Sequence, residues 1–488
     1  MSQTPPRTVI LLAAGEGKRM KSDLPKVLHP LLGRTLLGHV LVAAGAAEAG
    51  RTLVVVGHRA ELVTAHVAGI APDAATVLQA EQRGTGHAVR IALESLSDLT
   101  GTVVVLNGDV PLLRPETVAE LVRAHEDAGA AATVLAAEVD DPTGLGRIIR
   151  GADGSLERIV EERDATDAQR AVREINAGIY VFDGRLLGAA LGKLSTDNDQ
   201  GEEYLTDVLG LLGGSGERVG VHVAADPEET LGCNDRAELA GLRRRMRDRV
   251  NGAWMRAGVS MLDPVTTWVD VTVTLGRDAV IDQNTQLVGA TEIGPGAHVG
   301  PDTTLVDTTV GEGASVIRAH AVTAEIGPLV SVGPYAYLRP GTRLGRKAKV
   351  GTFVETKNAE IGAGSKVPHL SYVGDATIGE ETNIGAATVF ANYDGQTKRR
   401  SVIGSHARTG VDNMFVAPVE VGDGAYTAAG SVITSDVPPG ALGIARAQQR
   451  NIEDWVARRR PGTAADEAAR RANEAAGQAA DNDRAAGE

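Results

Sequence analysis

Apolar and polar positions follow one pattern in the first half of the chain and another in the second. Residues 8–15, 52–58 and 102–113 are short apolar runs of the kind that form buried strands. Amphipathic segments lie between such runs, and the spacing over 116–128 predicts a helix. Strands that alternate with helices indicate a parallel α/β sheet, so we expect a Rossmann-like domain over residues 1–236.

A charged segment separates the two patterns. Residues 234–258, "NDRAELAGLRRRMRDRVNGAWMRAG", are rich in Leu, Arg and Ala and contain no proline. This composition predicts a long, exposed connecting helix, which we place at residues 237–257.

From about residue 270 an aliphatic residue recurs every six positions. This period fits neither a lone helix nor an amphipathic strand, and it is the hexapeptide pattern of a parallel β-helix, in which three hexapeptides make one triangular coil. We expect a β-helix of this class, which is left-handed, over residues 258–460. The repeat positions are Ile293, Val299, Val310, Val316, Val322, Val332, Leu338, Leu344, Val350, Ile361, Val367, Val373, Ile378, Ile384, Phe390, Ile403, Thr409, Phe415, Val421, Thr427 and Ile433.

The last segment, residues 461–488, is polar and rich in alanine, with almost no large apolar side chains. It cannot bury enough surface to fold alone, so we expect disorder there.

Composition narrows the classes of function. The 488 residues carry a net charge of −14, which argues against general nucleic-acid binding because that needs a broad basic surface. The single cysteine, Cys233, allows no disulfide within the chain and no cysteine-based zinc site. No signal peptide and no apolar run of membrane-spanning length is evident, so we expect a cytoplasmic protein without membrane insertion.

A glycine-rich turn follows the first apolar run, in "LLAAGEGKRMKSDLPKVLHPL" (11–31). Gly15 and Gly17 permit a tight turn whose backbone N–H groups can face a phosphate, with Lys26 supplying positive charge. Met20 stands where a dinucleotide fingerprint would have its third glycine, so an NAD site matches poorly. Asp109 ends another apolar run; taken alone it would more simply cap a turn, but this is also where α/β sheets place ligands.

The repeat region holds one histidine, His369, in "VPHLSYVGD" (367–375), and the repeat breaks at "ANYDGQTK" (391–398). Alone, this histidine would more simply be a polar residue at a coil corner, because a β-helix does not imply catalysis. The neighbouring stretches "YLRPG" (337–341), "GTFVETKN" (351–358) and "GIAR" (443–446) change that balance.

Together with "LQAEQRGTGHAV" (78–89), "GLGRIIR" (144–150), "EINAGIYVF" (174–182) and "LGCNDR" (231–236), these motifs resemble one family over residues from about 8 to 455. It is the family of bacterial bifunctional N-acetylglucosamine-1-phosphate uridylyltransferases and glucosamine-1-phosphate acetyltransferases. The resemblance implies synthesis of UDP-N-acetylglucosamine for the cell wall from glucosamine-1-phosphate, acetyl-CoA and UTP. It also implies Mg²⁺ and a homotrimer.

For the first domain, the resemblance assigns residues to the nucleotide, the metal and the sugar. Arg19 and Lys26 would act on the UTP phosphates, and Asp109 with Asn234 would hold Mg²⁺. The other residues implied to line this site are Leu12, Ala13, Ala14, Gly15 and Gly17 at the nucleotide, Gln79, Gly84 and Thr85 at the uracil, Asn107 and Gly108 near the ribose, and Gly146, Glu161 and Asn176 at the amino sugar.

For the β-helix, the resemblance makes His369 the general base, with Glu355 orienting its imidazole. Histidine suits this role because its pKa lies near neutral pH. The other implied site residues are Arg339 and Lys357 at the phosphate, Tyr372 and Asn383 at the sugar, Asn392 and Tyr393 at a subunit boundary, Ala386 at the oxyanion, and Lys398, Val411, Ala429 and Arg446 at coenzyme A. Val411 departs from the serine usual at this position, so coenzyme A affinity could differ if the hydroxyl matters.

Two other hypotheses remain open from the residues. The chain could be a sugar-1-phosphate nucleotidyltransferase of single activity whose β-helix serves only assembly, which the set of His369, Lys357 and Arg339 disfavours. It could also be a trimeric scaffold without catalysis, which a magnesium site would not suit. Cys233 beside Asn234 could suggest a nucleophile, but an inert packed thiol is the simpler interpretation.

Overall fold

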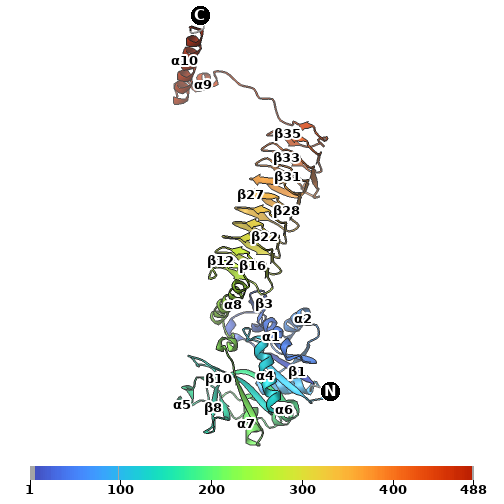
Figure 1. The fold of residues 1–488 in the computed structure, drawn as a ribbon, viewed down its shortest axis with the longest axis vertical. Helices are drawn as coiled ribbons and strands as arrows, with labels where there is room; N and C mark the ends of the chain where they lie inside the picture. The colour runs from blue at the N-terminus through green and yellow to red at the C-terminus, as the bar shows by residue number, and fades with distance from the viewer. Residues whose placement is uncertain (1–5, 97, 486–488) are drawn as a thin grey trace.

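The computed structural model describes residues 6–96 and 98–485. Figure 1 shows an α/β domain at one end, a long narrow column of short strands, and two terminal helices beyond the column at the end of an extended segment. The helix α8 (Arg236–Arg256) lies where the domain and the column meet.

The N-terminal domain contains a mixed sheet in the order β11-β7-β10-β6-β1-β4-β5, with β8 and β9 attached to β10. Its strands are β1 Arg7–Ala13, β4 Arg51–Val56, β5 Ala75–Leu78, β6 Thr102–Asn107, β7 Ala132–Glu138, β8 Arg147–Arg150, β9 Leu156–Val160, β10 Glu174–Asp183 and β11 Val219–Val223, and a small hairpin pairs β2 Pro30–Leu31 with β3 Arg34–Thr35.

The prediction of a purely parallel sheet needs one correction. The strands β1, β4, β5 and β6 are parallel as predicted, but β10 runs antiparallel to both β6 and β7. The chain returns from β7 to β10 through the β8–β9 hairpin rather than through a long helical crossover, so an antiparallel strand is possible there.

Helices cover both faces of this sheet. Successive β1 residues alternate between two cores, because Val9 and Leu11 pack with α1, α2 and α4 while Ile10 packs with α3, α6 and α7. The helices are α1 Leu36–Ala44, α2 Ala60–Ile70, α3 Thr85–Glu94, α4 Pro115–Ala128, α5 Asp167–Arg170, α6 Gly184–Leu191 and α7 Thr206–Gly214, with 3-10 turns η1 Lys18–Met20, η2 Lys26–Leu28, η3 Gly45–Ala47 and η4 Pro227–Thr230.

The predicted connecting helix is confirmed as α8. Its first turn is capped by the Asp235 side chain, which accepts hydrogen bonds from the N–H groups of Ala237 and Glu238. It is less exposed than predicted, because Leu239 and Leu242 on one face pack against the N-terminal domain. Cys233 lies fully buried in the same cluster, and burial raises the pKa of its thiol to about 11, as suits a packed thiol.

The C-terminal column is a parallel β-helix of short strands. Three strands make one coil, since β13 pairs with β16, β14 with β17 and β15 with β18, each offset by 18 residues such as Val269 to Leu287. The strands are β12 Ser260–Met261, β13 Trp268–Val269, β14 Thr274–Leu275, β15 Val280–Ile281, β16 Gln286–Val288, β17 Glu292–Ile293, β18 His298–Val299, β19 Thr304–Val306, β20 Thr309–Val310, β21 Ser315–Val316, β22 Ala319–Val322, β23 Glu325–Ile326, β24 Ser331–Val332, β25 Ala336–Leu338, β26 Arg343–Leu344, β27 Lys349–Thr352, β28 Glu355–Ile361, β29 Lys366–His369, β30 Tyr372–Ile378, β31 Val389–Ala391, β32 Ser401–Ile403, β33 Met414–Val416, β34 Glu420–Val421, β35 Tyr426–Thr427, β36 Val432–Ile433 and β37 Leu442–Gly443.

The hexapeptide positions form the core of this column. All but one of the repeat residues named above are buried, from Ile293 to Ile433. The exception is Val322. Its neighbour Ala321 points inward instead and pairs with Leu305 of the preceding coil. That pair is offset by 16 residues rather than 18, so a shortened coil moves the inward position by one residue.

The tail differs from the prediction of disorder. The structure describes α9 (Trp455–Arg459) and a longer helix, α10 (Ala464–Ala485), and residues 486–488 lie outside the described part. Alanine favours helix, and Asp466–Arg470 forms an i,i+4 ion pair on α10. Figure 1 shows α10 well apart from the β-helix.

Within residues 6–96 and 98–485, none of the helices combines the length and apolarity needed to cross a bilayer.

Two candidate active sites

The predicted phosphate turn lies at the carboxyl end of β1. Gly17 has φ +66°, and a Cβ there would come within 2.7 Å of the Lys26 Cβ, so glycine lets the two segments touch. The Lys26 ammonium forms an ion pair with the Asp109 carboxylate, and both side chains are mostly buried. The structure therefore joins the lysine and the carboxylate that the sequence placed 83 residues apart.

The candidate metal residues also come together. The Cys233 N–H donates to the Asp109 carbonyl at 3.0 Å, which places Asn234 beside Asp109. A carboxylate and an amide oxygen are ligands that Mg²⁺ accepts. Within the described chain, no three His, Cys, Asp or Glu residues are placed so that they could hold a metal ion together, so this pair would fit Mg²⁺ only with water and substrate phosphate as further ligands.

The residues predicted for the uracil meet at the start of α3. Gln79 is buried, and its Nε2 lies 3.2 Å from the Gly84 carbonyl and 3.1 Å from His87 Nδ1. Thr85 Oγ1 accepts a hydrogen bond of 3.1 Å from the Leu205 N–H. These contacts hold the Gln79 carboxamide in one orientation, as is required of a side chain that recognises a base by hydrogen bonds.

The three residues predicted for the amino sugar form one cluster. A Cβ at Gly146 would lie 3.3 Å from Glu161 Oε2 and 3.5 Å from Asn176 Cβ, and the Asn176 N–H donates to the Gly146 carbonyl at 2.9 Å. Glu161 also lines a cavity of about 390 Å³ together with Tyr204 and Thr206. Burial raises the pKa of the Glu161 carboxyl, while a hydrogen bond from Thr206 opposes the rise.

A turn in β10 connects the sugar cluster with the nucleotide side. The Asn176 carboxamide accepts from the Gly178 N–H at 2.9 Å and donates to the Tyr180 hydroxyl at 2.7 Å. Gly178 has φ +70°, and a Cβ there would lie 2.1 Å from Asn107 Nδ2, so only glycine allows this approach. Gly108, which follows Asn107 in the chain, donates its N–H to the Leu12 carbonyl at 2.9 Å.

On the β-helix, charged side chains gather over β28 and β30. Arg339 Nη1 donates to Glu355 Oε1 at 2.8 Å, and Glu355 stands beside Tyr372 in the strand register. Lys357 lies close to Lys398, whose hydrogen bond and positive charge lower the pKa of the Lys357 ammonium. Among the described residues, Glu355 therefore pairs with Arg339. It makes no described contact with the His369 imidazole, which the resemblance expects it to orient.

Asp375 is a member of this cluster that the sequence analysis missed. It accepts hydrogen bonds from Asn358 Nδ2, at 2.7 Å, and from Asn392 Nδ2. Its pKa is lowered because these bonds and the charges of Lys357 and Lys398 outweigh its partial burial. The signal was available in the coil period, since Asp375 follows Asn358 by 17 residues and Asn392 follows Asp375 by 17.

The repeat breaks where predicted, and the break is a loop between β31 and β32. The Arg399 N–H donates to the Asn392 carbonyl at 2.9 Å, and Tyr393 pairs with Lys398 in an antiparallel bridge. Tyr393 at the loop is 58% exposed. The loop thus returns Lys398 to the cluster while leaving an aromatic side chain in solvent.

The other predicted acetyltransferase residues lie along one corner of the triangular β-helix, in successive coils. The Ala387 N–H donates to the His369 carbonyl at 3.3 Å, the Asp412 N–H to Ala386 at 2.7 Å, and the Gly430 N–H to Val411 at 2.9 Å. Ala429 is exposed beside Gly430, and a Cβ at Gly430 would lie 3.8 Å from Arg446 Cδ.

Ser371 and Asn383 lie on either side of this corner. Ser371 Oγ donates to the His369 carbonyl at 2.7 Å, so the corner leads within three residues to Tyr372 and the charged cluster. Asn383 lies on the other side of the corner, beside Lys366 of β29.

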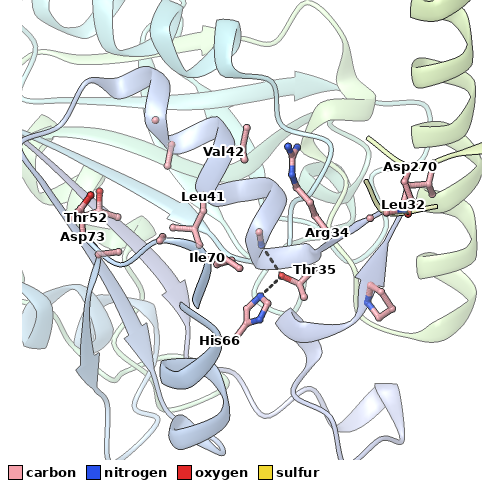
Figure 2. Close-up of a pocket in the computed structure, with 18 of the residues that line it drawn as sticks. Leu32, Arg34, Thr35, Leu41, Val42, Thr52, His66, Ile70, Asp73 and Asp270 are labelled. Atoms are coloured by element: carbon pink, nitrogen blue, oxygen red, sulfur yellow. Dashed lines mark hydrogen bonds between the residues drawn. The ribbon is translucent and has the colours of Figure 1, made fainter. Parts of the chain in front are cut away.

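A larger cavity, of about 1180 Å³, opens between the N-terminal domain and the first coils of the β-helix. Figure 2 shows Thr35 between α1 and His66, with Asp270 of the β-helix across the opening. The Thr35 hydroxyl lies 2.8 Å from His66 Nε2 and accepts from the Gly38 N–H. None of the predicted site residues lines this cavity.

Fold and side chains together define a class of protein: a nucleotidyltransferase domain joined to a parallel β-helix that bears a cluster of cationic side chains. Residues 9–178 match the family model of the MobA-like NTP transferase domain. The chain is 62% identical over 471 residues to a protein of Streptomyces avermitilis named Bifunctional protein GlmU, covering 96% of this chain and 98% of the relative. Relatives of the same name from Streptomyces coelicolor and Thermobifida fusca are 60% and 59% identical, covering 96% and 97% of this chain and 98% of each relative.

The chain belongs to the family of bifunctional GlmU proteins. It is a glucosamine-1-phosphate acetyltransferase and an N-acetylglucosamine-1-phosphate uridylyltransferase, and its two activities synthesise UDP-N-acetylglucosamine. The first hypothesis from the sequence is therefore confirmed over that of a single-activity enzyme or a scaffold.

Proposed function

We propose that the two reactions occur at separate sites with the residue roles set out above: acetyl transfer on the β-helix and uridylyl transfer in the N-terminal domain. The observation that carries this proposal is the convergence of Arg339, Lys357 and Lys398 on one wall of the β-helix. Glu355 and Asp375 offset part of this charge, but Lys398 and Arg339 still lower the pKa of Lys357, and an assembly scaffold gains nothing from such repulsion. A sugar phosphate would offset that repulsion.

In the acetyl transfer, Arg339 and Lys357 bind the phosphate of glucosamine-1-phosphate. His369 takes a proton from the ammonium, and the free amine then attacks the thioester carbon of acetyl-CoA. The Ala386 N–H stabilises the tetrahedral oxyanion. The carbon–sulfur bond breaks as the attacking nitrogen gives up a second proton to water. Coenzyme A leaves as the thiolate, and the proton held by His369 passes to sulfur. Lys398, Ala429 and Arg446 bind coenzyme A, where Val411 offers a contact without a hydroxyl.

In the uridylyl transfer, an oxygen of the sugar phosphate attacks the α-phosphorus of UTP in line with the departing pyrophosphate. Arg19 and Lys26 hold the phosphates and stabilise the charge that develops on pyrophosphate. Gln79 and Thr85 orient the uracil, and Glu161 and Asn176 orient the amino sugar. We propose that Asp109 and Asn234 hold Mg²⁺, which would offset the charge of the triphosphate when bound.

We propose that the chain forms a homotrimer through a corner of the β-helix next to His369. Tyr335, Phe353 and Leu370 occupy equivalent corner positions in successive coils and are 57%, 58% and 60% exposed. The rings of Tyr335 and Phe353 stack at 5.5 Å. Such an apolar ridge beside a charged site favours a neighbouring copy that completes the site. The substrates and the lone buried thiol favour a cytoplasmic location, and the product suits cell-wall synthesis.

The decisive experiment incubates the protein with acetyl-CoA, glucosamine-1-phosphate, UTP and Mg²⁺ and identifies the products by mass spectrometry. We expect UDP-N-acetylglucosamine, coenzyme A and pyrophosphate. Leaving out UTP should stop the reaction at N-acetylglucosamine-1-phosphate, and leaving out acetyl-CoA should yield almost no sugar nucleotide. A sugar nucleotide without acetyl would contradict our proposal that acetyl transfer precedes uridylyl transfer.

A further inference from the structure

Arg147 is the largest fully buried side chain of the described residues, with 1% exposure, and none of the roles above uses it. It begins β8, where it pairs with Val160 of β9 and with Ile175 of β10. A buried guanidinium is costly unless its hydrogen bonds are satisfied, so its contacts indicate what it holds.

The Arg147 guanidinium ties three segments together. One Nη donates to the Leu145 carbonyl in the loop before β8, and the other donates to Glu162 Oε2 at 2.7 Å and to the Arg170 carbonyl at 3.3 Å. The fork therefore connects the loop, the end of β9 and the end of α5. Its Nε has no partner among the described residues, so the contacts at the two Nη atoms carry the interaction.

Both ends of this connection are next to the proposed sugar residues. Gly146 lies between Leu145 and Arg147, and Glu161 precedes Glu162. Arg147 pairs with Val160 at the end of the β8–β9 hairpin, and Gly146 and Glu161 are the next residues beyond that pair on the two segments. Gly146 approaches Glu161 so closely that a Cβ added there would lie 3.3 Å from the carboxylate, and the Arg147–Glu162 ion pair joins the residues that directly follow these two in the chain.

We propose that Arg147, through its ion pair with Glu162, is a positioning residue that sets the amino-sugar site of the uridylyltransferase. The pair fixes Gly146 and Glu161 relative to one another before the sugar binds. This inference rests on the proposed amino-sugar site, and it adds residues that do not touch the substrate.

Arginine is required for this role because its planar fork serves several acceptors at once. In R147K one ammonium can reach only part of this set, and the positive charge remains. We expect a KM for N-acetylglucosamine-1-phosphate raised about tenfold, an order set by what supporting residues contribute elsewhere. The KM for UTP and the acetyl-transfer rate should stay within about twofold, because neither site contacts Arg147.

The chain offers a matched control on the same strand. Arg150, at the other end of β8, forms a similar fork with Glu174, with Nε to Oε2 at 2.7 Å, but this pair is more exposed and four residues from Gly146. R150K should leave both KM values unchanged. If R150K raises the sugar KM as much as R147K does, the effect belongs to the hairpin in general and the proposal is overturned.

Two further variants keep the test sharp if R147K loses stability. E162Q keeps the size of the side chain but removes its charge, and we expect the same selective rise in sugar KM. R147K/E162Q should raise the sugar KM by less than the product of the two single effects, because both substitutions weaken the same Arg147–Glu162 pair. A full-length, folded R147K with unchanged sugar KM would refute the proposal, as would additive effects in the double variant.

E161Q and N176A separate failure of this inference from failure of the proposed site. If they raise the sugar KM while R147K does not, the site stands and the positioning role falls. If neither alters the sugar KM, the proposed sugar site itself is wrong.

Discussion

The two candidate sites are built in opposite ways. In the N-terminal domain, residues far apart in the chain meet at the carboxyl ends of strands, and Lys26, Asp109 and Gln79 are mostly buried. On the β-helix, residues one coil apart meet on the surface, and His369, Tyr393 and Arg446 are exposed. The first site is enclosed by its own domain, whereas the second is an open wall.

The difference indicates what excludes water from each of the two sites. A nucleotide site inside an α/β domain excludes water with its own layers, so it can function within one chain. A β-helix is a rigid rod that presents side chains at fixed spacing but has no concave interior. It therefore needs a second surface, which the ridge of Tyr335, Phe353 and Leu370 beside His369 would contact.

The largest expected effect tests whether the open wall is catalytic. In H369A no base remains to deprotonate the amine, so we expect acetyl transfer to fall about 10²–10⁴-fold. Uridylyl transfer should stay within about twofold of the wild type. Release of coenzyme A and of pyrophosphate, measured separately, checks this.

H298A is the matched control for this variant. His298 is another exposed histidine of the β-helix, paired with Asp282 at 2.8 Å and located on β18. Both activities should survive its removal. Undiminished acetyl transfer in H369A would exclude the assigned base.

The second prediction tests the opposite case, in which uridylyl transfer is lost and acetyl transfer is kept. In D109A the Lys26 ammonium loses its partner and the candidate Mg²⁺ site loses its carboxylate. We expect Mg²⁺-dependent pyrophosphate release to fall on the order of 10²–10³-fold, as for loss of one charge-stabilising group. Acetyl transfer should be unchanged.

D153A provides the control, because the Asp153 carboxylate accepts hydrogen bonds from Ser155 in an exposed turn of the same domain. An equal loss of acetyl transfer in D109A would mean that the sites are not independent.

The same contrast decides what the sequence could predict. Outside the loop at 391–398 the coils of the β-helix are 16 to 18 residues long, so most inward residues follow from spacing, and Glu355–Tyr372 and Asn358–Asp375 are pairs one coil of 17 residues apart. Only the shortened coil at Val322 escaped this arithmetic. A period predicts contacts because the neighbour of every residue is one turn away.

The N-terminal domain offers no such period. Its apolar runs predict strands but not direction, which is why the antiparallel β10 was not predicted. The Lys26–Asp109 pair and the fork of Arg147 depend on tertiary packing across many residues. Motif resemblance supplied the first pair, whereas Arg147 lies outside every assigned role and became visible only through its contacts.

The third prediction tests whether the open wall needs a neighbour. F353E places a charge on the apolar ridge, so the proposed trimer should weaken by about tenfold or more in concentration. Light scattering coupled to size-exclusion chromatography would measure the dissociation, and acetyl transfer should fall with it while uridylyl transfer persists.

L262E is the control for an exposed apolar residue away from the ridge, since Leu262 is 70% exposed at the first coil. It should leave both assembly and activity intact. A wild-type chain that is monomeric and still acetylates would remove the argument for a shared site.

The smallest expected effect concerns the enclosure of the N-terminal site. Burial raises the pKa of Glu161 above its ordinary value of 4.5, with the nearby charges of Asp164 and Asp207 adding to the rise. The folded state therefore binds more protons than the unfolded state, so this group favours folding below pH 4.5 and loses that contribution as pH rises through its folded pKa. E161Q removes this loss.

The melting temperature of E161Q relative to wild type should therefore increase from pH 4 to pH 7, by about 2 °C on the scale at which one kcal/mol shifts a domain of this size. E157Q is the control, because Glu157 is exposed on β9, the strand that leads to Glu161, and its substitution should give a difference that does not change with pH. Scanning calorimetry of the N-terminal transition measures both. A flat difference for E161Q would mean that the sugar site is as open to water as the wall of the β-helix.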